Sequence, residues 1–227
     1  MARRMSDLAR RITSSAHLFP VVAFAFALAF TALPADGGNL NTAALPSASF
    51  PPGNPAHGEA LARTCAACHG SAEIKVGNPP IEPPKLLHER ASYVFNALIE
   101  FRSGKRTNDV MGPMAAPLND QDMRDIAAYL AAKPLGPPHA KMVGTPAYKF
   151  TVANCTLCHG ETGMGEMQGM PILTGQNKAY LKQALEEFKS GVRTNPTMQA
   201  VAKVLSPKEI DEVATYYSSQ EALETLP

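Results

Sequence analysis

Two short segments of the 227-residue chain share the pattern Cys-x-x-Cys-His-Gly, and they lie 90 residues apart. This pattern is the attachment signature of c-type haem, in which two thiols bond to the porphyrin and the histidine ligates the iron. On a helix, cysteines three residues apart share a face, so both thiols reach one porphyrin. The segments therefore predict two covalently attached haem c groups. The predicted attachment sites are Cys65, Cys68, Cys155 and Cys158, and the predicted proximal iron ligands are His69 and His159.

Other uses of cysteine pairs fit the sequence less well. Two pairs can build a four-cysteine zinc site, and one pair can act as a redox dithiol. A zinc site has no need of histidine and glycine directly after each pair, and a dithiol site would not be duplicated with its surroundings. All four cysteines of the chain belong to the two segments, so no cysteine is left as a further iron ligand.

The sequence that follows each segment is an internal repeat. From Pro84 onward, many residues recur 87 positions later, including Leu86/Leu173, Tyr93/Tyr180, Phe101/Phe188, Arg106/Arg193, Met111/Met198 and Tyr129/Tyr216. Such a repeat predicts two copies of one structural unit. Each copy is small for a self-sufficient core, and a covalently held haem supplies the missing apolar surface. We therefore expect an all-α fold with two tandem domains, each wrapped around one haem.

Met111 and Met198 are the predicted sixth ligands. They are equivalent in the repeat, and we expect each on a loop between the second and third helix of its half. A thioether opposite histidine raises the reduction potential and fills the sixth coordination position. At the first haem, Met114 and His88 remain rivals to Met111; for His88, whose counterpart is Gly175, a surface position beside the haem is the preferred interpretation.

Two further pairs of equivalent residues are candidates for supporting roles. The backbone carbonyls of Pro84 and Pro171 are placed to accept a hydrogen bond from the second ring nitrogen of each proximal histidine. Arg106 and Arg193 are candidates to neutralise haem propionates, with an exposed position at a helix end as an equally good interpretation.

Proline, glycine and capping patterns define the expected helices and boundaries. Helices are expected from Pro55 into the first haem segment, over 91–102, over 120–132 after an Asn119 cap, and over 207–218 after a Ser206 capping box. The expected organisation is a leader at 36–54, a first domain at 55–133, a linker at 134–146, a second domain at 147–220 and a tail at 221–227.

The N-terminus has the features of an export signal. Four arginines precede an apolar run from Leu18 to Leu33, and small residues follow, which predicts a signal peptide over residues 1–35 and a periplasmic location. An uncleaved anchor helix is the alternative. The 21 basic and 20 acidic residues nearly balance, which argues against a nucleic-acid partner.

In combination, these motifs resemble cytochrome c4 and related two-domain class I cytochromes c. The second half carries the resemblance most clearly, with Cys155-x-x-Cys158-His159-Gly160, Pro171-x-Leu173-x-Gly175-Gln176, Phe188-Lys189-Ser190-Gly191-x-Arg193, Met198 and Leu205-Ser206-Pro207-Lys208-Glu209. The resemblance implies two His/Met haem domains packed about a pseudo-twofold axis, and an electron shuttle in the periplasm, often near the membrane. The first half departs from this pattern, since His88-Glu89 replaces the Gly-Gln pair.

The predicted function is electron transfer, not catalysis. The expected partners are redox proteins of the respiratory chain, such as a terminal oxidase, with peripheral association to the membrane. An alternative is the electron-accepting haem subunit of a periplasmic dehydrogenase, such as a sulfide-oxidising flavocytochrome. A di-haem peroxidase is a third hypothesis, but it needs an open iron, and the two equivalent methionines argue against one.

Overall fold

The structure is a computed structural model that describes residues 50–70, 74–77, 80–132, 146–165, 167 and 169–220, without the side chains of 146–150. The predicted signal peptide and tail lie outside the described residues. The same holds for the predicted leader up to residue 49 and for the predicted linker up to residue 145.

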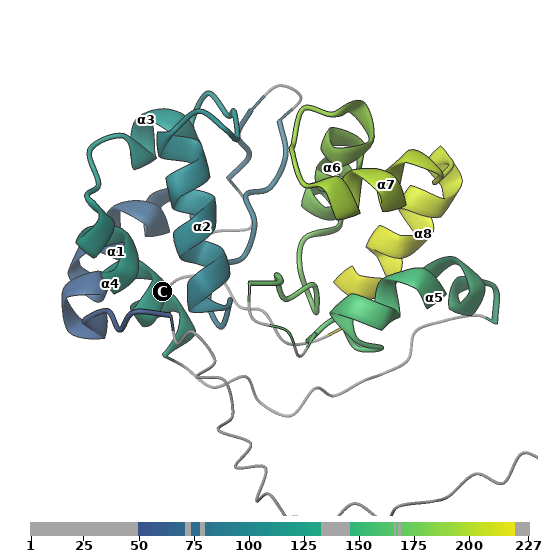
Figure 1. Ribbon diagram of the computed structural model, residues 1–227, viewed down its shortest axis with the longest axis horizontal. Helices are drawn as coiled ribbons and strands as arrows, with labels where there is room; N and C mark the ends of the chain where they lie inside the picture. Colours follow the sequence, from purple (N-terminus) through teal and green to yellow (C-terminus); the bar gives the residue numbers. More distant parts are fainter. Residues whose placement is uncertain are drawn as a thin grey trace, which may run out of the picture. The chain divides into compact units, whose positions relative to one another are not determined.

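The described residues form eight helices (Figure 1). They are α1 (Pro55–His69), α2 (Ala91–Arg102), α3 (Met111–Ala115), α4 (Asp120–Ala131), α5 (Pro146–His159), α6 (Lys178–Ser190), α7 (Pro196–Lys203) and α8 (Pro207–Ser218). Within the described residues, β pairing is limited to an isolated bridge between Val76 and Ile81. The predicted all-α fold is confirmed. No helix in this part of the chain is long and apolar enough to cross a membrane.

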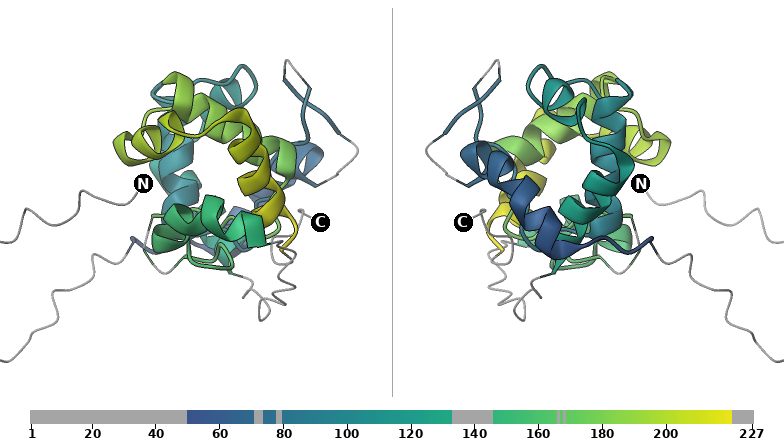
Figure 2. Two further views of the ribbon diagram at one scale, coloured as in Figure 1. Left: turned by 90° about the vertical axis from the view of Figure 1, so that its right-hand side faces the viewer. Right: turned by 90° about the vertical axis from the view of Figure 1, so that its left-hand side faces the viewer.

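The first four helices form one packed unit. α1 crosses α4, as the right-hand view of Figure 2 shows, and α2 packs against α3 and α4. Leu98, Met123, Ile126 and Leu130 are among the buried residues of its core. The predicted Asn119 cap is present, because its side chain accepts hydrogen bonds from the first turn of α4 in a capping box.

The last four helices form a second unit of the same kind. α8 packs against α5 and α6, and α6 packs against α7. Tyr217 and Ala214 of α8 are fully buried in the core beside Leu181 and Leu185 of α6. The predicted Ser206 capping box opens α8, with Pro207 at the first helical position.

The repeat extends to backbone geometry. The amide of His88 donates to Leu130 and the amide of Gly175 donates to Tyr217, both at 2.8 Å. The two acceptors are 87 residues apart, as are the two donors. His88 and Gly175 also share a left-handed backbone, with φ of 68° and 70°. His88 therefore occupies a turn in which glycine is the unstrained residue.

Two expectations need correction. His88 is only 9% exposed, so it is not a surface histidine. Met111 and Met198 lie on the short helices α3 and α7, not on loops. The physical reason is local capping: Asn108 accepts hydrogen bonds from the Val110 and Met111 amides, and Asn195 accepts one from the Met198 amide.

Candidate haem sites

Each cysteine pair lies near the end of a helix that stops at the predicted proximal histidine. Cys65 and Cys68 belong to the last turns of α1, which ends at His69, and Cys155 and Cys158 belong to the last turns of α5, which ends at His159. All four cysteines are half-buried, and none of them forms a disulfide. Burial raises the pKa of the Cys65 and Cys155 thiols. The thiols are thus placed at the border of each domain interior, where a porphyrin edge needs them.

His69 is held in one ring orientation by the backbone. It is 8% exposed, and its Nδ1 lies 2.7 Å from the Pro84 carbonyl oxygen. A carbonyl only accepts, so Nδ1 carries the proton and Nε2 keeps its lone pair. Burial lowers the pKa of the His69 ring, against the opposing effect of the Pro84 carbonyl, which favours the neutral ring that ligates iron. The predicted contact from Pro84 is present.

His159 differs from His69 in one respect. It is 7% exposed, and burial lowers its pKa while the Pro171 carbonyl opposes that effect. The contact falls short of hydrogen-bond geometry, so Nδ1 is a buried nitrogen without a partner. A buried donor without a partner is costly. Iron ligation through Nε2 would hold the ring in place, but it supplies no acceptor for Nδ1.

The two predicted methionine ligands occupy equivalent places. Met111 is half-buried and packs against the core of the first unit, and Met198 packs in the same way against the core of the second. Met114, the predicted rival on α3, is 39% exposed. Each half thus combines a buried histidine with a methionine against the same core.

The cap of α7 gives a direct test of how Met198 is positioned. Substitution Asn195→Ala removes the acceptor for the Met198 amide, and we expect it to lower the free energy of unfolding by about 1 kcal/mol. Thermal unfolding followed by circular dichroism measures this loss. Asn195→Asp keeps an acceptor and is the matched control; equal losses in both variants would show that the cap does not position α7.

Arg106 and Arg193 are buried at 9% and 8% exposure, so the interpretation as exposed helix-end residues is wrong. Each guanidinium stacks on an aromatic ring of its own half, Arg106 on Phe101 and Arg193 on Phe188, both at 4.5 Å. Neither forms an ion pair with a carboxylate in the described part of the chain. Two buried cations without an anion fit a group that brings its own carboxylates, such as haem with its propionates.

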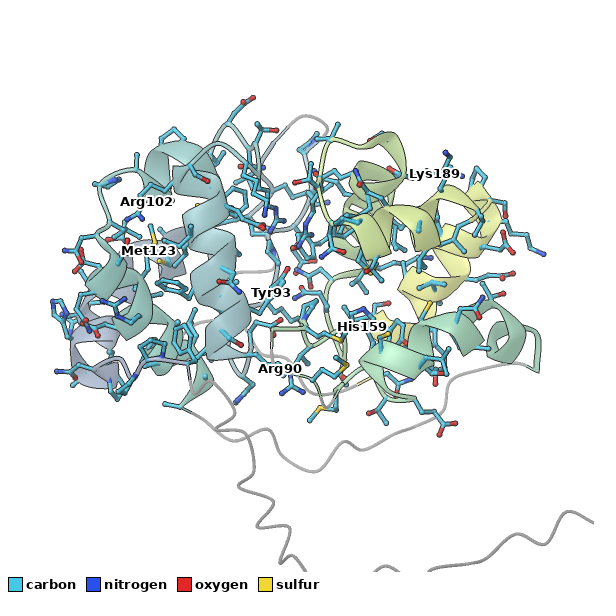
Figure 3. The ribbon with its side chains drawn as sticks, viewed as in Figure 1. Arg90, Tyr93, Arg102, Met123, His159 and Lys189 are labelled. Atoms are coloured by element: carbon cyan, nitrogen blue, oxygen red, sulfur yellow. The ribbon has the colours of Figure 1, made fainter. Side chains whose placement is uncertain are left out.

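Each arginine also bonds to a tyrosine of the opposite half. Arg106 donates to the Tyr180 hydroxyl at 3.1 Å, and Arg193 donates to the Tyr93 hydroxyl at 2.7 Å. The members of each pair are equivalent in the repeat, so the contacts are reciprocal. Figure 3 shows Tyr93 at the border between the two helical units. Burial raises the pKa of Tyr180, but Arg106 and Arg193 outweigh it and bring the pKa down to about 8. Both guanidinium groups therefore act on the tyrosine hydroxyls at this border.

Comparison with known proteins agrees with two haem domains. Residues 55–133 match the family model described as Cytochrome c, and residues 144–216 match the model described as Cytochrome C oxidase, cbb3-type, subunit III. A cytochrome c4 of Thiocapsa roseopersicina is 36% identical over 181 residues, covering 72% of this chain and 91% of that protein. The chain belongs to the cytochrome c4 family.

Two further relatives support this assignment. The thiosulfate dehydrogenase electron acceptor of Stutzerimonas stutzeri is 33% identical over 179 residues, covering 72% of this chain and 82% of that protein. The crystal structure of reduced cytochrome c4 from Pseudomonas stutzeri matches with a TM-score of 0.61 and 28% identity, covering 74% of this chain and all of that one. As a cytochrome c4 family member, the chain is a di-haem electron carrier with two covalently attached haem c groups.

Sequence reasoning missed the contacts that each half makes with the residue after the proline that faces the other half's proximal histidine. Gln176 accepts from the Lys85 amide at 2.8 Å and donates to the Lys85 carbonyl at 2.9 Å. Glu89 accepts from the Ile172 amide at 2.9 and 3.1 Å. The repeat shows that Glu89 stands where the second half has Gln176. It does not show which groups the Glu89 carboxylate contacts.

Proposed function

We propose that the chain is a periplasmic electron carrier in which His69 and Met111 ligate one iron and His159 and Met198 ligate the other. The observation that supports this most directly is the equivalence of the two halves. Each half places a buried histidine directly after the cysteine pair and a methionine on a capped helix against the same core.

The protein's own contribution is to hold the ligands and to keep water away. The bound haem supplies the one-electron chemistry. The Pro84 carbonyl fixes the ring of His69, and Asn108 and Asn195 hold the backbone amides of Met111 and Met198. A methionine in the sixth position leaves no site for oxygen or peroxide, which supports transfer over catalysis at iron. Redox proteins are the proposed donors and acceptors, and peripheral contact with the membrane is part of the proposal.

An oxidised sample tests the ligand set. Ferric haem with an axial methionine has a weak far-red absorption band, and its intensity per haem is to be compared with the haem content. We expect the intensity of two His/Met haems and no change on adding carbon monoxide to the reduced protein. An intensity of one haem, with carbon monoxide binding, would contradict ligation by Met111 or Met198 and favour an enzyme.

A second candidate function is electron acceptance within a dehydrogenase complex. The name of the Stutzerimonas stutzeri relative, a thiosulfate dehydrogenase electron acceptor, favours it. In this case a separate chain would oxidise the substrate and pass electrons to the two haems. Purification from native cells distinguishes the candidates: co-elution of a larger dehydrogenase that reduces both haems with a sulfur substrate supports the second, and a free carrier supports the first.

A further inference from the structure

Each proximal histidine faces a proline carbonyl, and the peptide group of that carbonyl contacts a side chain of the other half. The Pro84 carbonyl, which accepts from His69, and the Lys85 amide belong to the same peptide group. That amide donates to Oε1 of Gln176 at 2.8 Å, and Gln176 belongs to the second half. At the first haem site, the side chain that accepts from this peptide group is therefore the neutral amide of Gln176, from the second half.

The second haem site has the corresponding groups, with two differences: the Pro171 carbonyl faces Nδ1 of His159 outside hydrogen-bond geometry, and the side chain from the other half is a carboxylate. The Pro171 carbonyl, which acts on His159, shares a peptide group with the Ile172 amide. That amide donates to both carboxylate oxygens of Glu89 from the first half, at 2.9 and 3.1 Å. Glu89 and Gln176 are equivalent in the repeat, so the side chain that accepts from this peptide amide is ionisable at the second site and neutral at the first.

Glu89 is buried, and its surroundings bring the pKa of its carboxyl group close to neutral pH. It is 4% exposed, and burial raises its pKa to about 7, against the amides of Ile172 and Arg90 and the charge of Arg90. Tyr93 of α2 also interacts electrostatically with Glu89, and Arg193 donates a hydrogen bond to the Tyr93 hydroxyl. The Arg90 side chain donates hydrogen bonds to the backbone carbonyls of Met164 and Gly165.

We propose that Glu89 of the first domain sets the reduction potential of the haem in the second domain, acting through the Pro171–Ile172 peptide group on His159. The proposal rests on the proposed ligation of that haem by His159. An ionised carboxylate on the Ile172 amide polarises the peptide group, so the Pro171 carbonyl that faces Nδ1 of His159 becomes more negative and attracts the Nδ1–H more strongly. A more electron-rich imidazole and a nearby negative charge both stabilise ferric iron, so the potential falls.

The protonation state of Glu89 then couples proton uptake to electron transfer. Reduction takes one electron from the donor protein, and a proton from solvent binds to the Glu89 carboxylate when the pH is near its pKa. Below that pH the carboxyl group is already neutral, and above it the charge persists in both redox states. The potential of the second haem should therefore fall as the pH rises through about 7, while that of the first haem, next to Gln176, should stay level.

The test is a redox titration of each haem of the intact di-haem protein between acidic and mildly alkaline pH. The second haem is assigned by its loss of the far-red band in Met198→Ala. In the alkaline range, Glu89→Gln should raise the ratio of reduced to oxidised second haem about tenfold at a fixed ambient potential, which is about 59 mV for one electron. The same variant should remove the pH dependence. Glutamine is the residue at the equivalent position of the second half, so the substitution is the matched one.

A second measurement keeps the proposal testable without any variant. In the ferric wild-type protein, the Nδ1–H resonance of the second proximal histidine should shift with pH through about 7, and that of the first should not. Gln176→Glu should make the reduction potential of the first haem depend on pH, in addition to that of the second. A level wild-type potential, or one that keeps its slope in Glu89→Gln while both far-red bands are intact, would overturn the role of Glu89. Absence of the second band in the wild type would instead overturn the proposed ligation.

Discussion

Substitution Met198→Ala is expected to remove half of the far-red absorption band and to open the second haem to carbon monoxide. Met198 packs against the core of the second unit from the capped helix α7, and alanine has no group that reaches the iron. Loss of the thioether removes the ligand that stabilises ferrous iron, so the potential of this haem should fall by about 0.1 V or more. Spectra of both redox states, with and without carbon monoxide, and a redox titration measure the effect.

Two control variants make this result specific. Met111→Ala should have the same effect on the first haem, because Met111 occupies the equivalent place on α3. Met114→Ala should leave both bands intact, since Met114 is 39% exposed. A lost band in Met114→Ala, with none lost in Met111→Ala, would show that the first haem uses the rival methionine. A full band in Met198→Ala would contradict the ligand assignment of the second haem.

Those parts of the molecule that follow from local chemistry were predictable from the sequence. The helix over Ala91–Arg102 and the Asn119 and Ser206 caps agree with expectation, because periodicity, proline and capping residues act within a few positions. The short helices α3 and α7 were missed, although Asn108 and Asn195 stand three residues before each methionine in both halves. That spacing is a signal that the repeat already contained.

Contacts between the halves could not be predicted in the same way. The hydrogen bonds from the arginine of each half to the tyrosine of the other depend on how two folded surfaces meet, which no local sequence pattern encodes. The burial of His88 has the same origin, since a polar residue at a left-handed turn is ordinarily exposed. The glutamate at position 89 was recognised as a departure from the repeat, and only the structure showed that it reaches the peptide group beside Pro171.

Substitution Gly58→Ala is expected to destabilise the first domain by about 3 kcal/mol or more. α1 and α4 cross so closely at Gly58 that an added Cβ would lie 1.9 Å from the Asp125 carbonyl oxygen. The obstacle is backbone, which cannot turn aside as a side chain does, so the helices must separate and disturb the core around Met123. Since α1 also carries the first cysteine pair and His69, separation would loosen the first haem site. Thermal unfolding of a domain of this size should show a drop in melting temperature of about 12 to 24 °C.

The reverse change on the same helix is the matched control. Ala60 is exposed on α1, so Ala60→Gly changes helix propensity alone and should cost about 1 kcal/mol. By propensity, Gly58→Ala should stabilise α1 by a similar amount, so the expected loss has the opposite sign to the local effect. A stabilised Gly58→Ala variant would show that α1 and α4 do not approach this closely. A loss larger than that of Ala60→Gly, with the far-red band of the second haem unchanged, would locate the damage in the first domain.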